Sequence, residues 1–113
     1  EMTMHPDLKW CMSTIKKVKV FLCIYQANEL GRPSYKEEIA KNLNEYSYKS
    51  VAVIIDEGIS RGIYIPLKPS ASEVGDKKVK NIRPSVDLMA SFYNWNINRI
   101  ASLNSIVKKY SKS

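Results

Sequence analysis

The sequence is poor in the residues that most enzyme and metal sites require. It contains one histidine, His5, and four glycines in 113 residues. We expect His5 to lie in a frayed terminal segment, so it supports neither a histidine-based triad nor a multi-histidine metal site. The carboxylate pairs Glu37–Glu38 and Asp56–Glu57 are adjacent along expected helices and point in different directions. No glycine-rich phosphate loop occurs. The sequence therefore predicts no enzymatic activity, no metal and no cofactor.

Cysteines and long apolar runs are also scarce. Cys11 and Cys23 are the only cysteines, and both stand in an apolar helical pattern. This spacing matches neither a disulfide framework nor a zinc site, so we expect buried thiols, with a redox-sensing pair as the alternative. The apolar run Val51–Ile55 is far shorter than the roughly 20 residues that span a bilayer. We expect no membrane segment, no secretion signal and a cytoplasmic location, in a bacterial or archaeal cell or encoded by a phage or plasmid.

Positive charge is what the chain has in excess. Lysine and arginine number 18 against 11 aspartates and glutamates, a formal net charge of +7, of which +1 lies in residues 1–45 and +3 in each of residues 46–84 and 85–113. A basic balance favours a polyanionic partner, because neutralised phosphates release counterions, although many basic proteins bind no nucleic acid. Length and composition indicate one domain over residues 1–113.

Apolar residues at steps of three and four predict a long N-terminal helix over residues 7–30. Its stripe consists of Leu8, Cys11, Ile15, Val18, Leu22 and Tyr25, and Phe21, Ile24 and Ala27 broaden it. Such a wide apolar surface predicts packing on two sides, against the domain itself and against a second subunit. Gly31-Arg32-Pro33 should end the helix.

Residues 34–62 predict a helix-turn-helix. Ser34 and Glu37 have the spacing of a capping box, so a helix should start at Ser34, with Ile39, Ala40 and Leu43 inside. Ser47 should cap the next helix after a polar turn. Its inner face would be Val51, Ile54, Ile55 and Ile59, its outer face would be Tyr48, Lys49, Ser50, Val53 and Glu57, and Gly62 would close it.

A hairpin is predicted over residues 63–83. Residues 63–68 read as a strand, and Pro66 suggests a sheet edge because proline lacks the amide donor. Residues 78–83 would be the partner strand, and the polar residues 69–77 would form the tip. The fold class expected is mainly α with a small β-hairpin (α+β), a winged helix-turn-helix flanked by long N- and C-terminal helices.

A C-terminal helix is predicted over residues 85–110, because Pro84 disfavours helix before it and Ser85 suits a helix start. Met89, Tyr93, Asn96, Ile100, Leu103, Val107 and Tyr110 alternate steps of four and three, the seam of a coiled coil. We expect this seam to dimerise together with Leu8 and Ile15. The alternative is that it packs on the first helix of its own domain.

The order of elements resembles the MarR-type winged-helix transcription regulators. Residues 34–40 resemble the second helix of that family, residues 47–62 its recognition helix, Asp76-Lys77-Lys78 the tip of its wing, and residues 82–85 the lead into its dimerisation helix. Lys78 stands where that family often has arginine, and Val53 where a polar reader is common. The resemblance implies a homodimer and a pocket for a small-molecule effector. No residue of the sequence indicates which effector that would be.

The resulting hypothesis is sequence-specific binding of double-stranded DNA by a small dimeric transcriptional regulator, most simply a repressor. The expected DNA-binding residues are Ser34, Tyr35, Lys36, Ser47, Tyr48, Lys49, Ser50, Val53, Lys77, Lys78 and Lys80. One alternative is a winged helix used for protein assembly, which outward Ala52 and Val53 beside Tyr48 would suit. Another is a plasmid or phage replication-initiation domain that binds DNA through the same surface.

Overall fold

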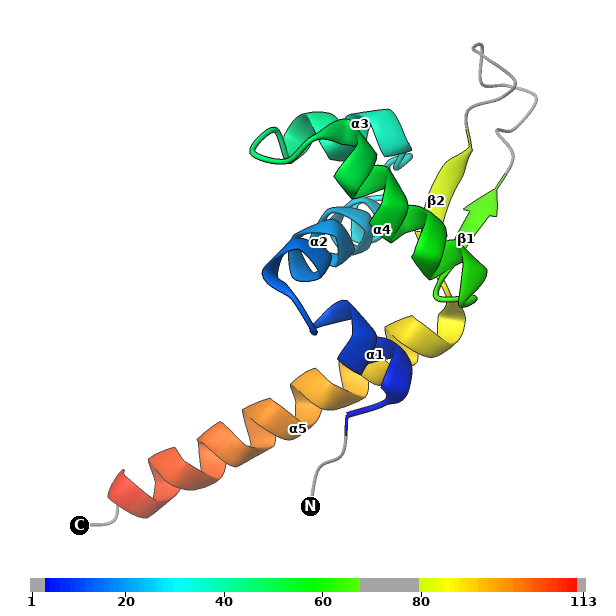
Figure 1. Cartoon of the computed structure of the whole chain (residues 1–113). Coiled ribbons are helices and arrows are strands. Elements are labelled where there is room, and N and C mark those ends of the chain that lie inside the picture. The colour runs from blue at the N-terminus through cyan, green and yellow to red at the C-terminus, as the bar shows by residue number, and fades with distance from the viewer. Residues whose placement is uncertain (1–3, 68–79, 112–113) are drawn as a thin grey trace.

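The protein is mainly helical and has one small antiparallel hairpin (Figure 1). The computed structural model describes residues 4–67 and 80–111. Its elements in chain order are α1 (Pro6–Cys11), α2 (Ile15–Glu29), α3 (Lys36–Asn42), α4 (Tyr48–Ser60), β1 (Tyr64–Leu67), β2 (Asn81–Pro84) and α5 (Val86–Ser111). The expected fold class, mainly α with a small β-hairpin, is confirmed at this level.

The expectation of a single helix over residues 7–30 is wrong, because the chain breaks at residues 12–14. Thr14 caps the start of α2, and its Oγ1 accepts a hydrogen bond from a backbone amide one turn later, at 3.1 Å. Ser13, two residues after the end of α1, donates a hydrogen bond from its Oγ to the carbonyl of Trp10 at 2.7 Å. Short hydroxyl side chains bond to nearby backbone groups in this way and compete with a continuous helix.

The break changes which residues of α2 face the core. Val20, Phe21 and Ile24 are fully buried, whereas Ile15 is 72% exposed and Leu22 is 45% exposed. The apolar stripe expected from the spacing therefore divides between two helices, and its α2 members Ile15 and Leu22 lie on the outer surface. A second apolar surface of α2 is left without a partner within the described residues.

Ser34 does not cap a helix, and the expected capping box is wrong. The residue at the start of α3 is Tyr35, and its side chain makes no capping hydrogen bond. Ser34 is buried instead, and its backbone pairs with β2: its carbonyl accepts from the Ile82 amide at 2.6 Å, and its amide donates to Asn81 Oδ1 at 2.8 Å. This long-range pairing extends the hairpin by a short segment and outweighs the local capping preference.

Within the described residues, β1 lies inside the expected strand 63–68, and β2 begins inside the expected strand 78–83 and runs one residue further, to Pro84. Tyr64 pairs with Pro84, and Pro66 pairs with Ile82. Because the amide of Ile82 points away from β1 toward Ser34, Pro66 stands at a position where no ladder hydrogen bond needs its missing donor. The prediction that Pro66 lies in an edge strand is confirmed, because β1 has only β2 as a neighbour among the described strands.

α4 follows the expected pattern closely. Val51, Ile54 and Ile55 face the core, and Gly62 ends the helix region with a φ of +75°, a left-handed conformation that glycine adopts without strain. The ring of Tyr64 lies directly against Gly58, so close that a methyl group at Gly58 would stand 2.2 Å from the ring atom Cδ2. This contact fixes α4 against β1.

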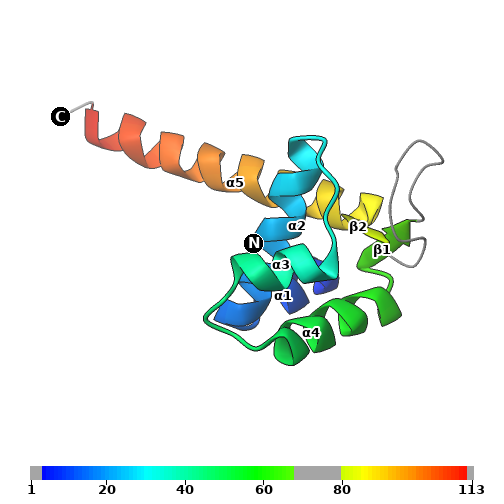
Figure 2. The same cartoon turned by 90° about the horizontal axis from the view of Figure 1, so that it is seen from above.

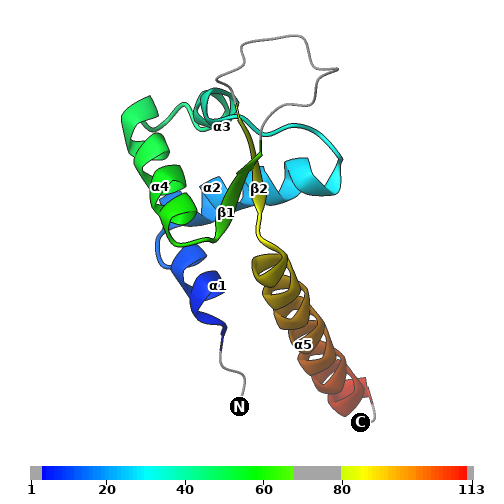
Figure 3. The ribbon, with the colours of Figure 1, turned by 90° about the vertical axis from the view of Figure 1, so that its right-hand side faces the viewer.

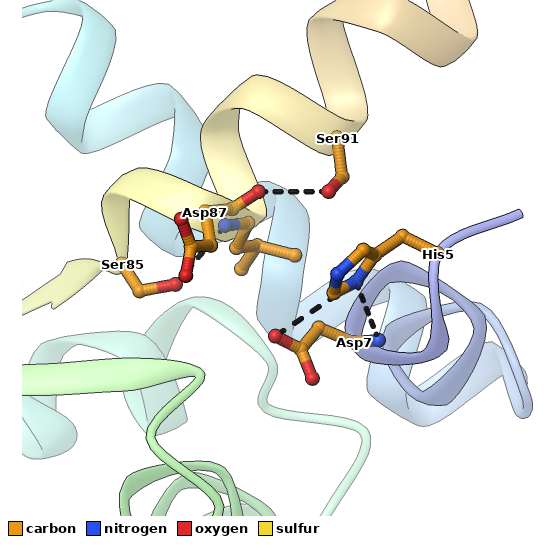
Figure 4. Close-up of polar contacts among 6 residues, drawn as sticks. His5, Asp7, Ser85, Asp87 and Ser91 are labelled. Carbon is orange, nitrogen blue, oxygen red and sulfur yellow. Dashed lines mark hydrogen bonds and ion pairs between the residues drawn. The ribbon is translucent and has the colours of Figure 1, made fainter.

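The starts of α1 and α5 are both capped by side chains (Figure 4). Ser85 Oγ accepts from the Leu88 amide at 3.0 Å, as the expected helix start at Ser85 requires. His5 Nδ1 accepts from the Asp7 amide at 3.2 Å, so the expectation that His5 lies in a frayed segment is wrong. The only histidine of the chain has a capping role.

Only the first turns of α5 pack against the rest of the protein. Leu88 is fully buried, Phe92 is 8% exposed and Trp95 packs against the core in part, whereas Ile97, Ile100 and Leu103 are each more than half exposed. α5 therefore projects from the other helices (Figures 1 and 3), and the molecule measures 61 × 30 × 24 Å. In residues 4–67 and 80–111, no helix has the length and apolarity to cross a membrane.

Candidate nucleic-acid interface

The exposed first turns of α4 form the centre of the candidate interface. Ser47 caps this helix, and its Oγ accepts from the Ser50 amide at 3.2 Å. Tyr48 is 51% exposed, Val53 is 55% exposed, and Lys49 is exposed beside them. The helical spacing predicted this outward face, which lies opposite the buried side of α4. Residues at the start of such a helix are the ones that reach base edges in helix-turn-helix proteins.

Two residues expected on this face form hydrogen bonds within the protein. Ser50 is half-buried, and its Oγ donates to the carbonyl of Ser47 at 3.0 Å. Ser50 therefore strengthens the helix start. The Glu57 side chain is 43% exposed, but its Oε2 accepts a hydrogen bond from Trp10 Nε1 at 2.7 Å. The hydrogen bond from Trp10, together with the nearby Lys17 and Arg61, lowers the pKa of Glu57.

Trp10 joins three helices at the end of α4 away from Tyr48. The ammonium group of Lys17 lies 4.5 Å from the centre of the Trp10 ring, and the guanidinium of Arg61 lies 5.5 Å from it. Arg61 Nε also donates to Glu57 Oε2 at 3.2 Å. These contacts fix α1 and α2 against the C-terminal half of α4, so they hold the candidate recognition helix in position.

The start of α3 is less suited to phosphate than the sequence suggested. Ser34 is only 3% exposed, and Tyr35 is half-buried. Lys36 forms an ion pair with Asp56 of α4, and Glu37 and Glu38 are exposed next to it. An anion approaching this end of α3 would meet one paired cation and two free-standing carboxylates.

Charge in residues 34–62 is therefore unevenly placed. The region has four basic residues against five acidic ones, a net charge of −1, namely Lys36, Lys41, Lys49 and Arg61 against Glu37, Glu38, Glu45, Asp56 and Glu57. Lys41 is in the last turn of α3 and Lys49 is in the first turn of α4, on either side of the connecting turn. Figure 2 shows this turn at the end of α4 away from the hairpin. With Glu45 between them, the turn and the helix ends beside it carry two basic residues and one acidic residue, whereas the rest of the region is net acidic.

Of the basic residues expected to bind DNA from the hairpin, the structure describes one. Lys80 is exposed directly before β2, while Lys77 and Lys78 lie outside the described residues. Arg83 of β2 turns toward the helices, and its Nη1 donates to Asn28 Oδ1 of α2 at 3.1 Å. This hydrogen bond anchors β2 against α2.

The expected dimerisation residues divide into buried and exposed groups. Leu8 is fully buried in the core of its own chain, so its assignment to an interface between subunits is wrong. Met89 and Asn96 are half-buried, and Tyr93 is 40% exposed and donates a hydrogen bond to the carboxylate of Glu29. That hydrogen bond raises the pKa of Tyr93 to about 12.

Beyond Asn96 the apolar side chains of α5 have no cover within the described residues. Ile97 is 62% exposed, Ile100 is 57% exposed and Leu103 is 56% exposed. Val107 belongs to α5, and its side chain lies outside the described residues. Intradomain packing uses Phe92 instead, whose ring lies 4.8 Å from that of Tyr25. The alternative of packing on the protein's own helix therefore holds for the first turns of α5 only.

The two cysteines are held as neutral thiols. Cys11 is fully buried, its Sγ lies 3.7 Å from the Tyr64 hydroxyl, and burial raises its pKa to about 11. Burial also raises the pKa of the half-buried Cys23. Since the thiolate is the reactive form, these environments disfavour redox sensing.

No family model, no curated protein and no solved structure matches this chain. Within residues 4–67 and 80–111, no three His, Cys, Asp or Glu side chains are grouped so that they could hold a metal ion.

Proposed function

We propose that the protein is a winged helix-turn-helix module that binds double-stranded DNA and acts as a homodimeric transcriptional regulator, most simply a repressor. The observation that carries this proposal is the capped and exposed start of α4, with α3 packed beside it and a hairpin directly after it. A major groove about 12 Å wide admits one such helix. The backbone pairing of Ser34 with β2 adds the short third segment that braces the hairpin.

In the proposed complex α4 enters the major groove with its first turn leading. Lys49 contacts a guanine edge or a phosphate, and Val53 contacts a thymine methyl group. Lys80 and the neighbouring Lys77 and Lys78 approach the backbone or the adjacent minor groove. Backbone contacts fix the position of the protein, and the α4 contacts select the sequence.

The uncovered stripe on α5 supports the homodimer. Ile97, Ile100 and Leu103 are each more than half exposed on one side of a projecting helix. Burial of apolar surface favours association by roughly 25 cal/mol per Å², so a second copy of the stripe is a suitable cover. A two-fold dimer would present two α4 helices to half-sites about 34 Å apart, one turn of DNA.

Protein assembly is the second candidate, and a specific observation favours it. The net charge of −1 in residues 34–62, combined with exposed Tyr48 and Val53, gives α4 a surface less polar and less basic than most DNA readers. In that case the hairpin and α4 would contact another protein. A replication-initiation domain would use the same DNA-binding surface.

Fluorescence anisotropy tests the proposal. A labelled 30-base-pair duplex of mixed sequence is titrated with the protein at several salt concentrations, while light scattering gives the mass in solution. We expect binding that weakens steeply with salt, by a particle of twice 12.9 kDa. Absence of binding at low salt would reject the DNA proposal in favour of protein assembly.

A further inference from the structure

Two lysines of α2 meet at the turn between α3 and α4. Lys16 and Lys19 are one turn apart on the same side of α2, and both reach over the ring of Tyr46. Their ammonium nitrogens lie 5.0 Å and 5.4 Å from the centre of that ring. We call these three residues, Lys16, Lys19 and Tyr46, the turn patch. Tyr46 comes immediately before Ser47, the cap of α4.

The turn patch is a concentrated positive site with little neutralisation. Lys19 has one carboxylate nearby, Glu45, at 3.8 Å, and its side chain is still 40% exposed. Lys16 forms no ion pair with a carboxylate in residues 4–67 and 80–111. Two like charges held over one ring repel each other, and a bound anion would remove that repulsion.

The position of the turn patch favours a DNA phosphate as the anion. The patch adjoins the first turn of α4, where backbone amides and the helix dipole also favour negative charge. If α4 enters a major groove by this end, the turn comes to lie over the sugar–phosphate backbone at the groove edge. The opposite end of α4 leads into the hairpin (Figure 1), so the two basic regions would hold the DNA from two sides.

We propose that Lys16 and Lys19 bind DNA phosphates beside the groove that α4 occupies. This inference rests on the proposed function. It assigns the main phosphate contact to the turn patch and not to the start of α3. At the start of α3 the charge of Lys36 is paired with Asp56, and Glu37 and Glu38 repel phosphate. The turn patch carries two cations against one nearby carboxylate, Glu45, so its balance is positive where that of the start of α3 is negative.

The test compares salt dependences of DNA binding in full-length variants. The double variant Lys16→Gln/Lys19→Gln removes both charges of the patch. The matched control Lys9→Gln/Lys108→Gln removes two charges from exposed positions on α1 and on the projecting part of α5. Each neutralised phosphate contributes about 0.9 to the slope of log K against log salt, so we expect the patch variant to lose about 1.8 from the wild-type slope.

The control variant should keep the wild-type slope. The variant Lys16→Arg/Lys19→Arg retains both charges and should also keep the wild-type slope. Equal slopes for the patch variant and the control, with wild-type binding intact, would overturn this inference and leave the proposed function standing. A wild-type protein that binds no duplex at low salt would overturn both. Circular dichroism of each variant confirms that a change in slope reflects contact and not unfolding.

Discussion

The contact between Gly58 and Tyr64 gives the sharpest test of how the candidate interface is supported. A β-carbon added at Gly58 would lie 2.2 Å from Cδ2 and 2.6 Å from Cε2 of the Tyr64 ring. The ring is 1% exposed, lies 3.7 Å from Cys11 through its hydroxyl, and packs edge-on against Trp10. It therefore cannot move aside without disturbing α1 as well as β1.

The expected effect of Gly58→Ala combines two opposing terms. Alanine is the better helix former by about 1 kcal/mol, and overpacking a dense core costs about 1–3 kcal/mol. With a rigid ring as the obstacle, the overpacking cost should lie near its upper end, so we expect a net loss of about 2 kcal/mol. For a domain of this size the unfolding midpoint should fall by about 8 °C.

The assay is thermal unfolding followed by circular dichroism at one fixed protein concentration, since association would shift the midpoint. Ser60→Ala, at an exposed position of the same helix, is the control and should stay within about 0.5 kcal/mol of the wild type. If Gly58→Ala proved as stable as the wild type or more so, the described packing of α4 on β1 would be refuted.

Three further predictions concern pH, assembly and the hairpin. Because Cys11 has its pKa raised from 9.0 to about 11 in the folded state, the unfolded state loses its proton first, so stability should be full well below pH 9 and fall by about 2 kcal/mol as the pH rises from 9 to 11. Denaturant unfolding should show this, and Cys11→Ala should have a shallower alkaline slope; an equal slope would contradict the buried thiol. Ile100→Asp/Leu103→Asp should give the monomer mass by light scattering, whereas Ser102→Asp, on the other side of α5, should leave the proposed dimer intact. Lys78→Ala should weaken binding to all DNA sequences alike and lower the salt slope by about 0.9, and an unchanged slope would remove the hairpin from the interface.

Local patterns were enough to predict α4 and its ends. The spacing of Val51, Ile54 and Ile55 defines one buried face, Ser47 supplies a cap, and Gly62 adopts a positive φ after the helix. Each of these signals acts within a few residues of chain, so the sequence alone contains them. The exposed residues Tyr48 and Lys49 follow from the same periodicity.

Long-range contacts account for most of what the sequence did not reveal. Ser34 has the sequence position of a helix cap, but its backbone is bonded to β2. In one of these bonds the partner, Asn81, lies 47 residues further along the chain. The gathering of Lys16 and Lys19 over Tyr46 likewise depends on how α2 crosses the turn, which periodicity does not encode.

At the break between α1 and α2 the sequence does contain a local signal. The apolar spacing continues through residues 12–14 and suggested one helix, although Ser13 and Thr14 form a hydroxyl pair that can end one helix and begin another. Heptad spacing on α5 is ambiguous for a different reason: neighbouring stripes share the same period, and Phe92, which lies outside the predicted seam, is the residue that packs in the core.

Chemical-shift mapping of the isotope-labelled protein during titration with duplex DNA tests the central claim most directly, because it locates the surface that binds. We predict that the backbone amides of Tyr48, Lys49 and Val53 shift most, with smaller shifts at Lys80, and that α1 and the far half of α5 stay unchanged. Shifts confined to α1 or α5, or no shifts at low salt, would contradict DNA binding through α4.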